Sequence, residues 1–137
     1  MIYQIEWEFV LILRRFLISL VLAQLTCCGG GAWAGALDAP KVAGMREMGS
    51  GVFVDPDMPP EQLVRLPRLV EGARRRVALY YGAAAARPNI VFCASTDCYS
   101  GFGGVGLGFS DGSNVLISPQ GQRIAIVAHE LAHVELA

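Results

Sequence analysis

The sequence predicts an α+β domain, because short apolar runs and two helical stretches share the last two thirds of the chain. Residues 51–54, 89–93 and 114–117 are rich in valine, isoleucine and phenylalanine, the composition of buried strands. Residues 59–82 carry apolar side chains at steps of three and four, which is the helical period, and residues 124–137 form a second helical stretch without proline. We expect a small sheet packed on a long helix and on a C-terminal helix.

Composition limits the size of the fold and the class of partner. The chain has 137 residues, of which 53% are hydrophobic, and a net charge of −1. This length fits one domain, and the near-zero charge argues against a nucleic-acid partner. Arg74, Arg75 and Arg76 form the one cationic run, which is typical of a solvated helix face.

The N-terminal segment has the order of a secretory signal. Arg14 and Arg15 precede an apolar run over residues 16–25, and small residues follow up to the Ala-x-Ala site that ends at Ala34. The apolar run is shorter than the roughly 20 residues that span a bilayer. We therefore expect residues 1–34 to be a cleaved signal peptide, with a membrane anchor as the alternative.

A third outcome for this segment is a lipoprotein. Leu25 to Cys28 has the spacing Leu-x-x-Cys after an apolar run, which resembles the bacterial lipobox, and Cys28 would then be the lipidated residue. Each of the three outcomes exports the domain, so we expect it to be periplasmic, secreted or anchored at the cell envelope. Contact with the membrane would be made only through the N-terminal segment.

Residues 35–51 lack a regular period, so we expect a flexible lead-in before a domain that spans residues 52–137. Pro59-Pro60-Glu61 is placed to open the first helix, since proline is favoured at the first helical position and an acidic residue suits the amino end of the helix dipole. Pro67 should kink that helix, and Gly82 should end it.

The strand over residues 89–93 ends at Cys93, five residues before Cys98. In an exported protein such a pair favours a disulfide across a tight loop; buried thiols or a metal ligand from Cys98 are the alternatives. The glycine-rich residues 101–108 lack the G-x-G-x-x-G spacing that leads into a nucleotide-binding helix. We expect a flexible loop beside the active site.

A turn over residues 111–113 separates this loop from the strand at 114–117, and Ser118-Pro119 caps the passage into the last helix. That helix contains His129-Glu130-Leu131-Ala132-His133. Residues four apart lie on the same helix face, so both imidazoles could reach one zinc ion with Glu130 beside them. Two ordinary surface or core histidines are the alternative, but the uncharged flanking residues favour the metal.

Residues 126–134 resemble the active-site helix of the zincin metallopeptidases. The resemblance implies a zincin-like fold, zinc ligands at His129 and His133, and a general base at Glu130 that serves the hydrolysis of a peptide or protein substrate. The strand over residues 114–117, which runs into this helix, resembles the edge strand that pairs with extended substrate in zincins. Glu135 departs from the pattern, because zincins usually have an apolar residue there.

The third zinc ligand decides between the functions that remain open. Asp97, Asp111 and Glu71 are upstream candidates, and none has a distinctive spacing. We expect an exported zinc metallopeptidase if a third ligand is present. A catalytically inactive zinc-binding or structural domain of the cell envelope is the alternative. A further alternative is a truncated product of a metallopeptidase gene, since the sequence ends before the downstream ligand that zincins usually supply.

Overall fold

The computed structural model describes residues 36–41, 43–82 and 86–137, which belong to one compact unit, Trp33–Ala137. The predictions for the signal peptide or anchor, for cleavage after Ala34 and for lipidation of Cys28 lie outside the described residues. Among the helices of the described part, none is long and apolar enough to cross a membrane.

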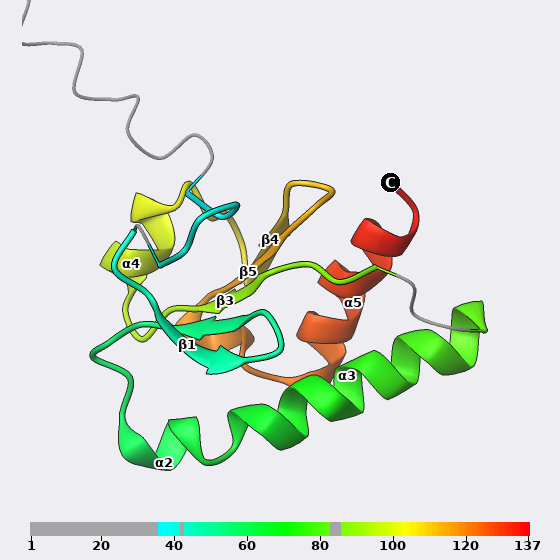
Figure 1. Cartoon of the computed structure of the whole chain (residues 1–137), viewed down its shortest axis with the longest axis horizontal. Coiled ribbons are helices and arrows are strands. Elements are labelled where there is room, and N and C mark those ends of the chain that lie inside the picture. Colours follow the sequence, from blue (N-terminus) through cyan, green and yellow to red (C-terminus); the bar gives the residue numbers. More distant parts are fainter. Residues whose placement is uncertain (1–35, 42, 83–85) are drawn as a thin grey trace, which may run out of the picture. The chain divides into compact units, whose positions relative to one another are not determined.

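The described chain is a mixed α+β fold, as the sequence predicts, and its sheet has five strands, two more than the sequence predicts (Figure 1). Its elements are β1 (Arg46–Gly49), β2 (Val52–Val54), α2 (Pro60–Leu63), α3 (Leu66–Tyr81), β3 (Ile90–Phe92), α4 (Thr96–Gly101), β4 (Gly108–Ser110), β5 (Val115–Ile117), a 3₁₀ turn (Pro119–Gly121) and α5 (Ile124–Glu135).

The sheet has the strand order β1-β2-β3-β5-β4. Strands β2, β3 and β5 run parallel and are buried along their whole length, whereas β1 and β4 are antiparallel edge strands. Central parallel strands are covered on both faces, which explains their continuous apolar runs in the sequence. The strand that leads into the last helix, β5, is therefore interior, and the edge beside it is β4.

Helices cover the two faces of the sheet unequally. Alternate residues of the central strands, such as Val54, Phe92 and Ile117, pack with the buried sides of α3 and α5 in one apolar cluster. The residues between them, such as Val91 and Leu116, pack in a second cluster with α4 and with the segment before β1. This alternation follows from the period of two along a strand. It places α5 and α4 on opposite faces of the sheet.

Two local predictions are corrected by the structure. The sequence predicts one helix kinked at Pro67, but α2 ends at Leu63 and α3 begins at Leu66. Proline has no N–H for the carbonyl four residues earlier, which is that of Leu63, and its ring crowds the same turn. The expected starts and ends otherwise hold, since Pro60 opens α2 and Gly82, with φ of 94°, ends α3.

The lead-in predicted as flexible over residues 35–51 contains β1 and contributes to the core. Leu37 and Met45 are buried against the second apolar cluster. The Asn114 amide donates a hydrogen bond to the Asp38 carboxylate at 2.6 Å. Strand β1 could not be predicted from the sequence, because its four residues are all exposed and do not alternate between apolar and polar side chains.

Candidate metal centre

Helix α5 carries the histidine pair on the side that the core does not use. Val127, Ala128 and Leu131 are buried against α3 and the sheet. His129 and His133 are four residues apart and share a different face of the helix. Their side chains therefore point away from that core. Both histidines are exposed, so the residues that bury the helix also fix where its imidazoles lie.

The two imidazoles face each other across one helical turn. Their Nε2 atoms are 3.1 Å apart, and the ring planes are perpendicular with centroids 4.7 Å apart. Two zinc–nitrogen bonds of tetrahedral geometry would place the nitrogens about 3.3 Å apart. The pair fits a shared metal ion, and without one the same separation fits a hydrogen bond from one ring to the other.

Glu130 is turned the other way, and only 8% of its surface is exposed. Its side chain packs against the backbone of Gly108 in β4, where an added Cβ would stand 2.7 Å from the Glu130 Cγ and 2.8 Å from its Oε1. Glycine at position 108 is what lets the edge strand and the carboxylate approach this closely. The carboxylate therefore lies between the helix and the edge of the sheet.

Tyr99 of α4 reaches the same region from the opposite face of the sheet. Burial of its side chain, and to a smaller extent the negative charge of Glu130, raises the pKa of the Tyr99 hydroxyl above its ordinary value. The protonated hydroxyl donates a hydrogen bond of 2.7 Å to the carbonyl of Val105. Tyr99 thus holds the glycine-rich loop that leads into β4.

Strand β4 presents unpaired backbone groups beside Glu130. The N–H of Ser118 donates to the carbonyl of Leu107, and the N–H of Asp111 donates to the carbonyl of Asn114. Because antiparallel partners alternate along a strand, residues 107, 109 and 111 direct their backbone groups toward β5. Gly108 and Ser110 direct theirs outward, as an edge strand does when it can accept another chain.

The edge strand and the helix enclose an open depression of about 480 Å³. Residues of β4 and the turn after it form one wall, and Glu130 and His133 form the other. An extended segment lying here would pass the outward backbone groups of β4 and the carboxylate together. The depression thus places the outward backbone groups of β4 beside Glu130 and His133.

The start of β4 is fixed by the chain just before α5. The carbonyl of Leu107 accepts hydrogen bonds from the backbone N–H and the hydroxyl of Ser118, and that hydroxyl accepts one from the N–H of Gly121. A Cβ on Gly121 would lie 1.9 Å from the same carbonyl oxygen. Ser118 caps the 3₁₀ turn as the sequence predicts, and it also anchors the edge strand.

Cys93 and Cys98 form the predicted disulfide, with Cα atoms 5.6 Å apart. It links the end of β3 to α4, a short helix capped by Ser95 that the sequence analysis does not predict. Neither sulfur is available as a metal ligand. The disulfide braces the helix that carries Tyr99.

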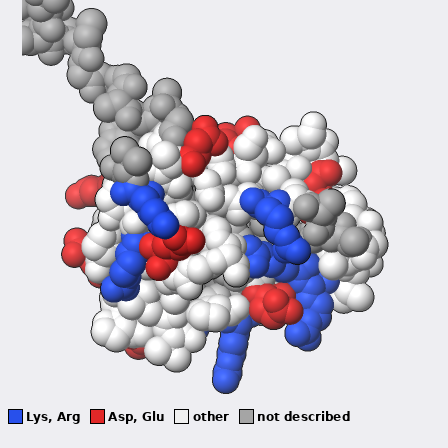
Figure 2. Space-filling view, in the orientation of Figure 1, with Lys and Arg blue, Asp and Glu red and all other residues white. Residues whose placement is uncertain are grey.

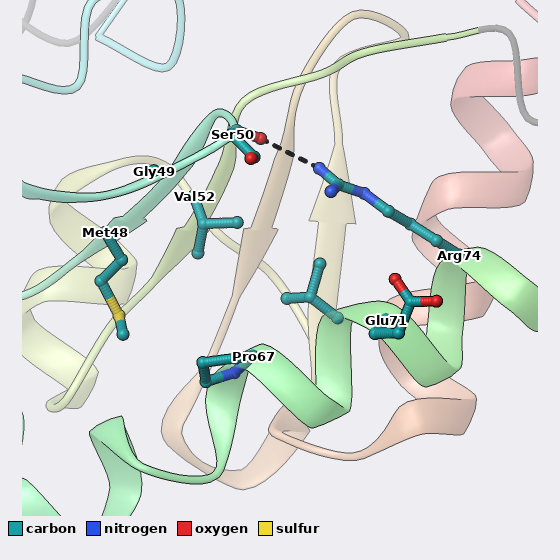
Figure 3. A pocket seen from close by; sticks show the side chains of 8 residues that line it. Met48, Gly49, Ser50, Val52, Pro67, Glu71 and Arg74 are labelled. Carbon is teal, nitrogen blue, oxygen red and sulfur yellow. Dashed lines mark hydrogen bonds between the residues drawn. The ribbon is translucent and has the colours of Figure 1, made fainter.

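The three upstream candidates for a third ligand are not brought to the histidine pair. Asp97 lies in the first turn of α4, on the other face of the sheet. The carboxylate of Asp111 accepts from the N–H groups of Ser113 and Asn114. Glu71 lines a separate cavity of about 220 Å³ between α3 and the β1–β2 turn, together with Arg74 (Figure 3).

Across the described residues, no group of three or more His, Cys, Asp or Glu side chains is arranged to hold a metal ion. If the pair at His129 and His133 bound a metal ion, it would be a partial donor set. The chain supplies two imidazoles and an adjacent carboxylate, and the remaining positions around an ion would be left to other ligands.

The sequence does not predict Ser110 and Tyr99 as parts of the site, whereas Gly108 is the last residue of the glycine-rich segment expected beside it. The hairpin itself had a signal, since Asp111-Gly112 between apolar residues is a strong short-range turn pattern. Phe109, on the strand before that turn, packs in the second apolar cluster. The contact between Gly108 and Glu130 had no signal, because the two residues meet only through the packing of α5 on β4.

No family model, curated protein or solved structure gives a significant match to the chain.

Proposed function

We propose that the chain is an exported zinc metallopeptidase that hydrolyses peptide bonds at the depression between β4 and α5. The observation that carries the proposal is that one helical turn of α5 directs two imidazoles to the solvent and the carboxylate between them toward the edge of the sheet. Two exposed imidazoles lie 3.1 Å apart, and the carboxylate between them in sequence is buried against an edge strand. Neither feature is needed for an ordinary packing helix.

Each chain group has a separate task in this proposal. His129 and His133 would hold the zinc ion. Zinc bound there would polarise the scissile carbonyl and make water more acidic. Glu130 accepts the proton of the attacking water and delivers it to the leaving amine.

The edge strand places the substrate. The outward N–H and C=O groups of Gly108 and Ser110 pair with an extended peptide, as in other cases of strand addition. A peptide paired in this way would have its scissile carbonyl beside α5, on the side of β4 away from β5. The order of the strands and the position of α5 support a zincin-like arrangement, which belongs to this proposal together with the peptidase activity.

A catalytically inactive zinc-binding domain of the cell envelope is the second candidate. It is favoured by the incomplete donor set, since the described residues bring only two ligands together and structural zinc needs four. The two candidates differ in whether Glu130 has a task. A peptidase needs the carboxylate, whereas a structural site does not.

Zinc binding tests the proposal first. Equilibrium dialysis with metal analysis should show zinc bound to the wild type and lost from His129→Ala and His133→Ala, because one imidazole then remains. Glu130→Gln should retain the metal. If the wild type and His129→Ala hold equal zinc, the pair is an ordinary feature of the helix surface and both candidates fail.

Peptide hydrolysis separates the candidates once zinc is bound. A library of unstructured peptides incubated with the zinc-loaded wild type should yield cleavage products, and Glu130→Gln should yield none above background. Zinc binding with no cleavage by the wild type would favour the structural candidate.

A further inference from the structure

The outer side of α3 concentrates positive charge although the whole chain is nearly neutral. Residues 64–82 contain five arginines and one acidic residue, Glu71. Figure 2 shows Lys and Arg side chains gathered over the region of α3. We call Arg65, Arg68, Arg75, Arg76 and Arg123 the arginine face. Arg74 is not part of it, because its guanidinium donates to the carbonyl of Ser50 in the β1–β2 turn (Figure 3).

Most of these guanidinium groups have no ion pair within the described residues. Arg75 lies 3.7 Å from Glu71, an exposed contact one helical turn apart, which contributes little to stability. No carboxylate in the described chain pairs with Arg65, Arg68, Arg76 or Arg123. Their charge is therefore available to an external anion.

Three of them surround one open depression. Arg65 and Arg68 line it from the start of α3, and Arg123 lines it from the residue before α5. Its volume is about 420 Å³, and Leu69 and Ile124 form its apolar floor. Guanidinium groups suit phosphate because their planar N–H donors match its oxygens.

Large apolar side chains protrude along the same face. Arg68, Arg75 and Leu79 follow one another in α3 at steps of seven and four, which puts them on one line of the helix surface. Val64 lies in the turn just before α3. Val64 is 77% exposed and Leu79 is 83% exposed. An alternation of arginine with exposed aliphatic side chains is the pattern of helices that lie on a membrane surface.

We propose that the arginine face docks on an anionic lipid bilayer, with lipid phosphate at the depression of Arg65, Arg68 and Arg123 and with Val64 and Leu79 among the lipids. The face is extended, since sixteen residues of α3 span roughly 24 Å, which is more than a single free phosphate would cover. Nucleic acid would use the charges but would leave Val64 and Leu79 without a partner. The inference does not depend on the proposed peptidase activity.

Docking in this way leaves the histidine pair accessible. The depression lies at the amino end of α5, while His133 lies in its last turn. The bilayer would therefore hold the domain at the envelope without covering the groove beside β4. Contact with the membrane would then involve the folded domain as well as the N-terminal segment.

Vesicle binding of the full chain tests the proposal. Residues 1–35 include an apolar run that can bind neutral and anionic bilayers alike. The readout is therefore the ratio of two partition coefficients, in which this shared contribution cancels. One is measured on vesicles of equal parts phosphatidylglycerol and phosphatidylcholine, and the other on phosphatidylcholine alone. The triple variant Arg65→Gln/Arg68→Gln/Arg123→Gln should lower this ratio about fivefold per arginine, or about a hundredfold in total.

A matched variant controls for net charge. Lys41→Gln/Arg46→Gln/Arg87→Gln removes the same charge from outside the arginine face and should leave the ratio within about twofold of wild type. A triple Arg→Lys variant of Arg65, Arg68 and Arg123 should keep most of the binding, which excludes misfolding as the cause of the loss. Equal losses in both glutamine variants would overturn the proposal.

Two other ligands of the arginine face, free phosphate and nucleic acid, would give different results in binding experiments. If inorganic phosphate at constant ionic strength displaces the wild type from anionic vesicles, the depression is a free-phosphate site and the bilayer is not its ligand. If the Arg→Gln triple loses binding to a single-stranded oligonucleotide but keeps its vesicle ratio, the face serves nucleic acid. Each of these results overturns membrane docking.

Discussion

The two edges of the sheet are protected to very different degrees. Strand β1 carries Arg46 and Glu47, and its register with β2 shifts between Glu47 and Gly49, which marks a bulge. Charges and bulges are the usual means by which an edge strand is kept from pairing with another chain. Strand β4 has neither, since Gly108, Phe109 and Ser110 are uncharged and pair with β5 in regular register. The edge that is left open is the one beside Glu130.

In the proposed function, the open edge is where the substrate would pair. An unprotected edge strand is an aggregation risk, and here it coincides with the depression lined by Glu130 and His133. The following changes test whether pairing at β4, and not at β1, serves the proposed activity. They are ordered from the largest expected effect to the smallest.

Glu130→Gln should abolish most of the peptide hydrolysis, by about 10²- to 10⁴-fold in kcat, because the amide cannot accept a proton. The change is nearly isosteric, so the packing against Gly108 is kept. Single-turnover cleavage with zinc-loaded protein measures the loss. If the Glu130→Gln variant kept activity within about twofold of wild type, Glu130 would not be the general base of the reaction.

Gly121→Ala should lower the free energy of unfolding by about 2 to 4 kcal/mol. Its Cβ would meet the carbonyl oxygen of Leu107, a backbone atom that is already held by Ser118. Urea denaturation measures the change. Gly44→Ala measures the separate cost of a positive φ, because nothing lies within 4 Å of its Cβ position, whereas Gly121 has no positive φ and its expected loss comes from the contact alone.

Gly108→Ala should reduce activity much more than stability. The new methyl group would collide with the Glu130 side chain, and a side chain can move aside more easily than backbone. We expect a loss of about tenfold or more in kcat with about 1 kcal/mol or less in stability. Equal losses in both properties would show that the contact serves the fold alone.

Ser110→Pro should raise KM for a peptide substrate about tenfold, because it removes an outward N–H without touching the bonds to β5. Ser110→Ala keeps that N–H and should have little effect on KM. Comparing the two variants separates backbone pairing from side-chain contact. An unchanged KM in the proline variant would place the substrate elsewhere.

Arg46→Val with Glu47→Val should increase self-association slightly by removing the charges that protect β1. The bulge remains, so we expect a shift of the monomer–dimer equilibrium by less than about tenfold. Light scattering across a concentration series detects it. Peptide hydrolysis should not change, since β1 lies at the far edge from Glu130.

The sequence predicted those parts of the fold that depend on local pattern. The buried strands around Val91 and Leu116, the helix start at Pro60 and the Cys93–Cys98 disulfide all follow from residue type and spacing. Strand β1 and helix α4 could not be found in this way. The first is fully exposed, and the second is a six-residue helix with no apolar period to detect.

In the candidate site, too, the local pattern predicts some features and the packing of distant elements sets the others. His129, Glu130 and His133 are four residues apart at most, so helical geometry alone places the imidazoles together. The contact of Glu130 with Gly108 and its proximity to Tyr99 depend on how α5 and α4 pack on opposite faces of one sheet. No local pattern encodes that packing.

The alternation of backbone groups along β4 also sets how fast its amide hydrogens exchange with deuterium. The N–H of Phe109, directed into the ladder with β5, exchanges only when the strand opens. The N–H groups of Gly108 and Ser110 face outward and exchange with the solvent directly. A peptide seated on the edge slows those two amides and leaves Phe109 unchanged, so every second residue of a three-residue strand reports whether the edge is occupied.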